Sequence, residues 1–134
     1  MILVDTHVLI RYMRDEGRLG KRTVTSIQRA LDDSELFVSP ITFWEIARLV
    51  ARERIELDTT VGLFRTTAIE HGCRELAIDG TIAVLAAELP DAHGDPADRL
   101  LVATAIQRGL TLLTADAVLL EWKLRGYRVR DATE

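Results

Sequence analysis

Four acidic residues lie next to or within apolar segments of the sequence, where a charged side chain is unusual. Asp5 directly follows the apolar run at residues 2–4, and Asp116 comes shortly after the run at 112–114. In open parallel α/β sheets, ligands bind beyond the carboxyl ends of the strands. If both runs are buried strands, the two carboxylates lie at the same edge of the sheet. Each aspartate could instead simply cap the helix that follows it.

Glu45 and Asp98 lie inside segments that are predicted to be helical. The neighbours of Glu45 are apolar or aromatic, so its carboxylate is expected to be at least partly buried, which is costly for an unpaired charge. Asp98 shares a helix face with apolar residues and is expected to point toward the sheet. A salt bridge from Arg48 or Arg52 would satisfy Glu45, and a capping role beside Asp95 would satisfy Asp98, so these structural alternatives stay open.

Carboxylates that converge on one cleft would repel one another. Two such charges about 4 Å apart cost on the order of 4 kcal/mol at an effective dielectric constant near 20. A hard divalent cation removes this cost, and a ligand set made of oxygen favours Mg²⁺ or Mn²⁺ over softer metals. A bound metal of this kind activates water and stabilises a leaving oxygen, which suits phosphodiester hydrolysis. The residues therefore suggest a metal-dependent hydrolase whose ligands and catalytic groups are Asp5, Glu45, Asp98 and Asp116.

Strand and helix signals alternate along the chain, which predicts an α/β sandwich with a mainly parallel central sheet. Short strands are expected at residues 2–4, 36–38, 74–77, 110–113 and 127–129. Helices are expected from about 6 to 13, 23 to 31, 40 to 52, 58–60 to 72, 79 to 89, 96 to 109 and 116 to 124, with a loop at 90–95. The pairs Ser39-Pro40 and Asp95-Pro96 each combine a helix cap with a proline at the first helical position.

The length and composition indicate one small domain. A chain of 134 residues fits a single compact unit spanning residues 1–134. One cysteine, Cys73, and three histidines make a disulfide impossible within the chain and argue against a structural zinc site. Neither a signal peptide nor a membrane span is expected, so a cytoplasmic protein is predicted. The net charge of −4 argues weakly against nucleic-acid binding, although acids gathered around a metal would reverse their local effect.

Four segments, taken in order, resemble the PIN-domain ribonucleases, and closely the VapC-type toxins of bacterial toxin–antitoxin pairs. The resemblance covers essentially the whole chain and is carried by ILVDTH at 2–7, SPITFWEI at 39–46, DPADRLLVATA at 95–105 and LLTAD at 112–116. Each segment is a weak motif by itself, whereas the ordered set is specific. The resemblance implies a three-layer α/β/α sandwich with a five-stranded sheet in the order 3-2-1-4-5.

The same resemblance implies a Mg²⁺- or Mn²⁺-dependent endoribonuclease that serves as the toxin of such a pair. It assigns the metal to the four acids named above. Thr6 and Thr114 match hydroxyl positions that support the acidic cluster or its water, and Arg99 is expected to be structural, bracing Asp98. Ala97 stands where the family often has a bulky aromatic residue, which should affect packing beside the site more than the chemistry.

The implied partners are an RNA substrate and a cognate antitoxin protein, in a homodimer or a toxin–antitoxin hetero-oligomer. An antitoxin could place an arginine or lysine among the acids and an amphipathic helix in an apolar groove near Trp44 and Val50. Trp44 and Trp122 are expected in the core or at an interface rather than as surfaces for base stacking. His7 is interpreted as a helix-start residue, and His71 and His93 as surface residues.

Three alternatives stay open. The first is a PIN-like domain that binds RNA or a protein without cleaving. The second is a phosphorelay receiver with an acidic pocket, which is disfavoured because Asp5 has no acidic neighbour and no lysine follows residues 112–114. The third is a nuclease acting on DNA flaps, which is disfavoured because such enzymes carry insertions for which this chain has no room.

Overall fold

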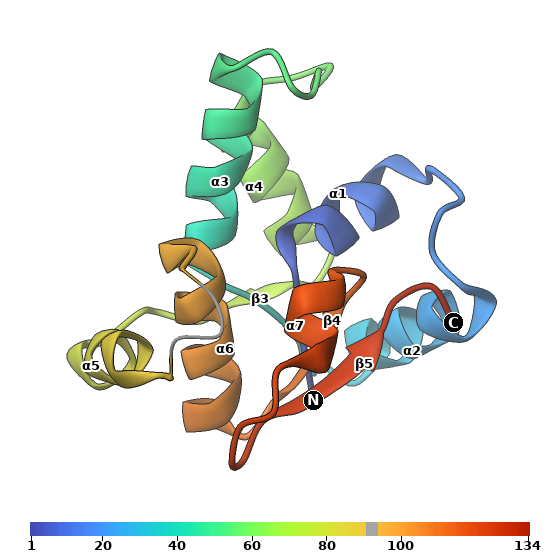
Figure 1. The fold of residues 1–134 in the computed structure, drawn as a ribbon. Coiled ribbons are helices and arrows are strands. Elements are labelled where there is room, and N and C mark those ends of the chain that lie inside the picture. Colours follow the sequence, from blue (N-terminus) through green and yellow to red (C-terminus); the bar gives the residue numbers. More distant parts are fainter. Residues whose placement is uncertain (91–93) are drawn as a thin grey trace.

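Helices and strands alternate along almost the whole chain. The computed structural model describes residues 1–90 and 94–134 (Figure 1). The strands are β1 (Ile2–Val4), β2 (Leu36–Val38), β3 (Arg74–Glu75), β4 (Thr111–Thr114) and β5 (Arg128–Asp131). The helices are α1 (Thr6–Arg14), α2 (Lys21–Asp32), α3 (Pro40–Ala51), α4 (Val61–Glu70), α5 (Gly80–Glu88), α6 (Pro96–Arg108) and α7 (Ala117–Glu121).

The five strands form one sheet in the order β3-β2-β1-β4-β5. All four strand pairings are parallel, with β1 at the centre between β2 and β4. The predicted fold class and strand order are therefore confirmed. Because the strands run the same way, their carboxyl ends meet at one edge of the sheet, and the loops that follow β1 and β4 are neighbours there.

Each face of the sheet is covered by its own layer of helices. On one face, Ile2 and Val4 of β1 pack into a core with residues of α1, α2, α3 and α4. On the other face, Leu3 packs with residues of α5, α6 and α7. Successive side chains of a strand point to opposite faces, so this short apolar strand contributes to both cores. The result is a three-layer α/β/α sandwich (Figure 1).

The predicted elements are confirmed with small shifts at their ends. Strand β3 has two residues instead of four. Helix α7 ends at Glu121 because Trp122 leaves it in an extended conformation and is buried, with 5% of its surface exposed. Strand β5 runs on to Asp131, which pairs with Thr114. Part of the predicted loop at 90–95, including His93, lies outside the described residues.

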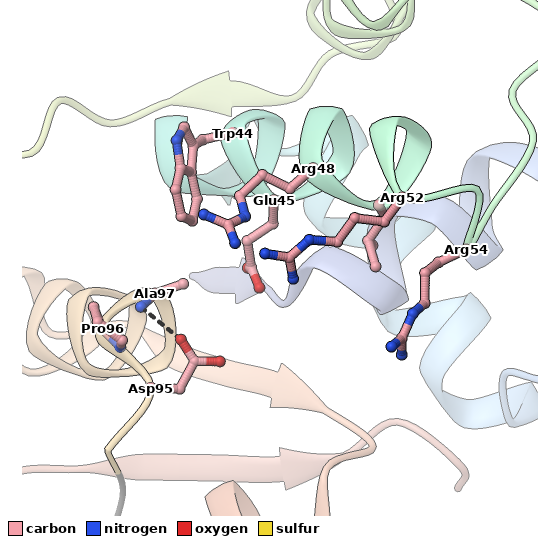
Figure 2. Close-up of a pocket in the computed structure, with 9 residues that line it drawn as sticks. Trp44, Glu45, Arg48, Arg52, Arg54, Asp95, Pro96 and Ala97 are labelled. Atoms are coloured by element: carbon pink, nitrogen blue, oxygen red, sulfur yellow. Dashed lines mark hydrogen bonds between the residues drawn. The ribbon is translucent and has the colours of Figure 1, made fainter.

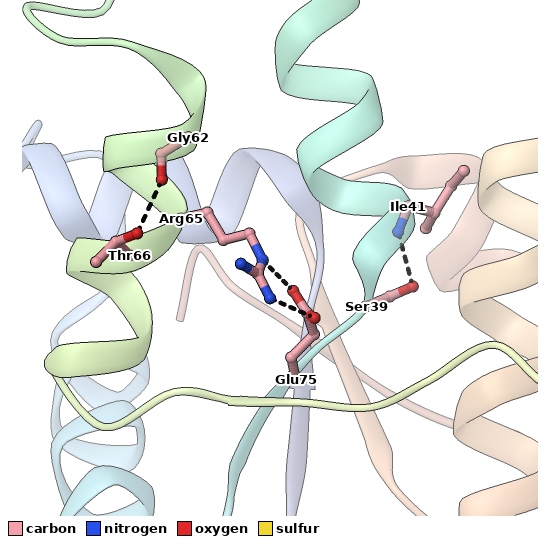
Figure 3. A network of polar contacts seen from close by, with 6 residues as sticks. All are labelled: Ser39, Ile41, Gly62, Arg65, Thr66 and Glu75. Atoms are coloured by element: carbon pink, nitrogen blue, oxygen red, sulfur yellow. Dashed lines mark hydrogen bonds and ion pairs between the residues drawn. The ribbon is translucent and has the colours of Figure 1, made fainter.

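The edge strand β3 is held to α4 by an ion pair. Arg65 donates to both oxygens of the Glu75 carboxylate, from Nε at 2.8 Å and from Nη2 at 2.9 Å (Figure 3). At the start of α3, the Ser39 hydroxyl accepts the Ile41 N–H at 3.2 Å, as the cap signal predicts. In residues 1–90 and 94–134, no helix is long and apolar enough to cross a membrane.

Candidate active site

Two of the four predicted acids lie at the carboxyl ends of adjacent strands. Asp5 follows β1 and Asp116 follows β4, and these strands are paired from Ile2 to Val4. The hydroxyl of Thr114 joins them: it donates to Asp5 Oδ2 at 2.6 Å and accepts the Asp116 N–H at 3.1 Å. Parallel pairing thus brings together two residues that are far apart in the sequence.

Asp5 is a buried carboxylate that does not cap a helix. It occupies the N-cap position of α1, yet its side chain makes no capping hydrogen bond there. Only 6% of its surface is exposed. Burial raises its pKa above the usual value, and the Thr114 hydrogen bond and the charge of His7 lower that pKa in part. The capping alternative for Asp5 is therefore wrong, and the carboxylate is left for another purpose.

Glu45 approaches from α3, on the side of the helix that faces the sheet edge. The Thr6 hydroxyl donates to Glu45 Oε1 at 2.6 Å, and the Thr42 hydroxyl lies 3.2 Å from that of Thr6. Burial raises the pKa of Glu45, with a further contribution from Asp5 and Asp95. The ion pairs found among the described residues include none between Glu45 and Arg48 or Arg52, so the salt-bridge alternative is not supported.

Asp98 is joined by a neighbour that the sequence analysis assigned to capping. Carboxylate oxygens of Glu45, Asp95 and Asp98 all lie within 4.8 Å of one another. Asp95 does cap α6, because its Oδ1 accepts the Ala97 N–H at 2.9 Å (Figure 2). The signal that could have identified Asp95 is its position one helical turn before Asp98.

Asp98 is the acid on which the neighbouring carboxylates act together. Burial, the largest cause, and the charges of Asp95, Asp5, Glu45 and Asp116 together raise its pKa to about 8. Near neutral pH, this carboxyl group therefore holds a proton unless a cation compensates its charge. The five carboxylates thus form one electrostatic unit, named the acidic cluster below.

Asp116 lies at the rim of the acidic cluster and has a second task. It is exposed, and its Oδ1 accepts the N–H groups of Val118 and Leu119 at 2.8 and 3.2 Å. The capping alternative is therefore correct for Asp116, although it does not exclude a role for Oδ2. Tyr127, which the sequence analysis did not single out, is also close: burial raises its pKa, and the charges of Asp5, Asp98 and Asp116 add to this.

Arg99 is structural in a different way from that expected. Its Nε donates to the carbonyl of Ala86 at 2.9 Å, and its Nη2 donates to the carbonyls of Ala87 and Leu89. These bonds tie the carboxyl end of α5 to the first turn of α6. Arg99 thereby fixes the helix that carries Asp98, and whether it also braces the carboxylate stays a prediction.

The surroundings of Trp44 differ from the expectation. Trp44 is 51% exposed and lines a cavity of about 380 Å³ whose walls include Arg48, Arg52 and Arg54 (Figure 2). Val50 lines a separate pocket. Trp44 and Val50 thus line two different pockets, and the pocket beside Trp44 is lined by charged as well as apolar residues. Trp122 lies in the core, whereas Trp44 does not, so for Trp44 only the expected interface position is left as a prediction.

The acidic cluster fits a hard divalent cation. Its donors are carboxylate oxygens, three of them already within 4.8 Å, and their raised pKa values show that burial and repulsion oppose full ionisation. Mg²⁺ and Mn²⁺ prefer such oxygen donors. Two threonine hydroxyls hold the innermost carboxylates in place, so the site is ordered from within the fold.

Comparison with known proteins supports one family. The PIN domain profile matches residues 2–122. Ribonuclease VapC22 of Mycobacterium tuberculosis is 36% identical over 128 residues, which cover 95% of this chain and 92% of that protein. Two solved structures are similar in fold. The first is VapBC2 from Rickettsia felis bound to a DNA fragment from its promoter, with a TM-score of 0.71 and 11% identity over 98% of each chain. The second is a toxin–antitoxin complex from Klebsiella pneumoniae, with a TM-score of 0.59 and 20% identity over 95% of each chain.

Proposed function

This chain belongs to the PIN domain family, and from that premise we propose that it is a Mg²⁺- or Mn²⁺-dependent endoribonuclease that serves as the toxin of a toxin–antitoxin pair. The observation that carries the proposal is the acidic cluster, in which carboxylates from two strand ends and two helices lie close together and three of them have raised pKa values. The similarity to Ribonuclease VapC22 supports RNA as the substrate. A receiver domain would not account for the family match.

Asp5, Glu45, Asp98 and Asp116 are the proposed metal ligands and catalytic groups, and Asp95 extends the set. A divalent metal bound there supplies an activated water and neutralises charge on the leaving oxygen of a phosphodiester. The protein contributes position and charge. Repulsion within the acidic cluster disfavours the empty, ionised site, so a cation is bound in part because it relieves that repulsion.

The two threonines orient the innermost carboxylates. Each makes a 2.6 Å bond to a carboxylate oxygen, Thr6 to Glu45 and Thr114 to Asp5. A hydrogen bond donated to a carboxylate favours its ionised form and fixes which oxygen remains for a ligand. Thr6 and Thr114 therefore act as supporting residues, because they favour the ionised forms of Glu45 and Asp5 and fix the orientation of these carboxylates.

The proposed protein partner is an antitoxin. The Klebsiella pneumoniae structure, which this chain resembles in fold, is a toxin–antitoxin complex. A basic side chain of such a partner would neutralise the acidic cluster as a metal does and would block access of RNA. We propose assembly with the antitoxin, or self-association as a homodimer, as the resting state in the cell.

Expression in a host without the antitoxin tests this function. The parent protein should arrest growth and leave new RNA ends that sequencing can map, because the nuclease is then unrestrained. Asp98→Asn should do neither, whereas Asp33→Asn, which removes an equal charge at an exposed site before β2, should behave as the parent. Arrest without new RNA ends would indicate a PIN domain that binds RNA or protein without cleaving.

A further inference from the structure

One aromatic residue and three arginines form a row along α3 and the turn after it. Trp44, Arg48 and Arg52 follow one another at intervals of four residues, so they stack on the same side of the helix. Arg54 joins them because the helix ends in a Schellman turn. In this turn, the Glu53 N–H donates to the Val50 carbonyl and the Arg54 N–H to the Leu49 carbonyl, at 3.0 and 2.8 Å.

The turn depends on a left-handed residue. Glu53 adopts a φ of 55°, which lets the chain fold back over the end of α3. As a result, Arg54 lines the same cavity as Arg48 and Arg52, instead of continuing away from it. These four residues, Trp44, Arg48, Arg52 and Arg54, are named the arginine row below. Figure 2 shows the three guanidinium groups on the same side of α3 as the Glu45 side chain.

The arginine row is exposed, and its positive charges are accessible to a ligand. All three arginines are exposed, and none takes part in the ion pairs found across residues 1–90 and 94–134. The guanidinium of Arg48 lies over the Trp44 ring, 4.6 Å from its centroid, a cation–π contact that orders both side chains. The row could simply complement the carboxyl end of the helix dipole. That role would not require Arg54 to be turned back or Trp44 to be exposed.

Two members of the acidic cluster also line this cavity. Glu45 and Asp95 line it together with the three arginines. A chain that lies in this cavity and reaches Glu45 and Asp95 is therefore also within reach of the arginines. The protein carries a net charge of −4, so a polyanion needs local positive charge in order to approach.

We propose that the arginine row is the binding track for the RNA strand next to the scissile phosphate, with the arginines contacting phosphates and Trp44 stacking on a base. This inference rests on the proposed function, because it places the substrate of that site. Guanidinium groups bind phosphate oxygens in a fork geometry, and an exposed aromatic ring provides a stacking surface for an unpaired base. The pairing of both features beside the acidic cluster favours single-stranded RNA over an acidic protein segment, which would have no use for the stacking surface.

The test measures RNA binding as a function of salt. The probe is a fluorescein-labelled single-stranded RNA of mixed sequence, bound to the full chain carrying Asp5→Asn in Mg²⁺, so that it is not cut. The slope of log K against log salt is negative, and each lost phosphate contact reduces its magnitude by about 0.7 for a single strand. Replacing Arg48, Arg52 and Arg54 together by glutamine should therefore reduce the magnitude of the slope by about 2.

Arg125→Gln is the matched control. Arg125 is exposed in the turn before β5, at the opposite edge of the sheet, so the same substitution there should leave the slope unchanged. An unchanged slope in the triple variant would overturn the proposal, and so would an equal loss in Arg125→Gln. If the triple variant loses binding to a polyglutamate peptide but not to RNA, the row recognises an acidic protein segment instead, which also overturns it.

Tryptophan fluorescence tests the stacking contact. Trp44 is exposed and Trp122 is buried, and they are the two tryptophans of the chain, so RNA should quench the emission of Trp44 and leave that of Trp122. Trp44→Ala should abolish the quenching and weaken RNA binding on the order of 10-fold. Quenching that persists in Trp44→Ala would overturn the stacking assignment.

The proposed function can fail separately. The further inference alone is wrong if two results are found together. The parent chain with intact Asp5 cleaves RNA in Mn²⁺, and the triple variant in the Asp5→Asn background binds RNA as tightly as Asp5→Asn alone. If the parent neither binds nor cleaves RNA, both are wrong. When Asp5 is restored, the triple substitution should raise the KM for RNA far more than it lowers kcat. The reason is that the arginines contact phosphates next to the scissile one and not the scissile phosphate itself.

Discussion

Replacing Thr114 by valine should weaken metal binding. The fold should lose no more stability than it does when another buried threonine is replaced by valine. Thr114 is completely buried, and its hydroxyl is 2.6 Å from Asp5 Oδ2. Valine keeps the shape of the side chain but cannot donate a hydrogen bond. The pKa of Asp5, which burial already raises, should rise further, because one of the groups that lower it is gone.

The size of the effect follows from that bond. A hydrogen bond to a charged group contributes about 1.5–3 kcal/mol. Since about 1.4 kcal/mol is a factor of ten in affinity, Mn²⁺ should bind roughly 10- to 100-fold more weakly at a fixed pH near neutrality. The loss should shrink as the pH rises, because Asp5 is then ionised even without its donor.

Isothermal titration calorimetry with Mn²⁺ at several pH values measures this directly. Thr104→Val is the matched control: Thr104 is equally buried, and its hydroxyl donates to the Leu100 carbonyl at 2.7 Å within α6. That variant should lose stability with little change in Mn²⁺ affinity. If Thr114→Val and Thr104→Val bind Mn²⁺ equally well across the pH range, the supporting role of Thr114 is refuted.

Three other predictions concern the acidic cluster. The pKa of Asp98 is raised from 3.8 to about 8, so in the metal-free protein its contribution to stability should be lost progressively as the pH rises between those two values. Thermal melts should show a Tm that falls over this window and levels off above it, and a flatter profile in Asp98→Asn. Mn²⁺ at about 100 times its Kd should stabilise the fold by about 2.7 kcal/mol and raise the Tm by several degrees, a shift that Glu45→Gln should reduce; an unchanged Tm in the parent would count against a competent site. Asp95→Ser keeps a side-chain acceptor for the Ala97 N–H, so calorimetry should find weaker Mn²⁺ binding at nearly unchanged stability, and full affinity would show that Asp95 only caps.

The fold was predictable because its local signals agree. The short apolar runs, the two cap-then-proline pairs and the glycine after α6 all indicate the boundaries that the structure has. Where the prediction missed, tertiary packing decided the outcome. Helix α7 stops early because the buried Trp122 is needed in the core, and a local pattern does not contain that requirement.

The acidic cluster was predictable only in part, for a related reason. Asp5 and Glu45 stood out because apolar neighbours imply burial, and both are found at the sheet edge with raised pKa values. Asp95 was missed because capping α6 already explained it, although one carboxylate can cap with one oxygen and face the site with the other. The arginine row depends on the reversal at Glu53, which residue spacing along a helix cannot reveal.

The central claim is that the acidic cluster cuts RNA with the help of a divalent metal. Its most direct test is the single-turnover cleavage rate of purified protein on single-stranded RNA, measured in Mn²⁺, in excess EDTA, and in the Asp98→Asn and Asp33→Asn variants. We expect cleavage in Mn²⁺ by the parent and Asp33→Asn, loss in EDTA that excess Mn²⁺ reverses, and a loss of several orders of magnitude in Asp98→Asn with its fold intact. Undiminished cleavage in EDTA, or by Asp98→Asn, would contradict the account.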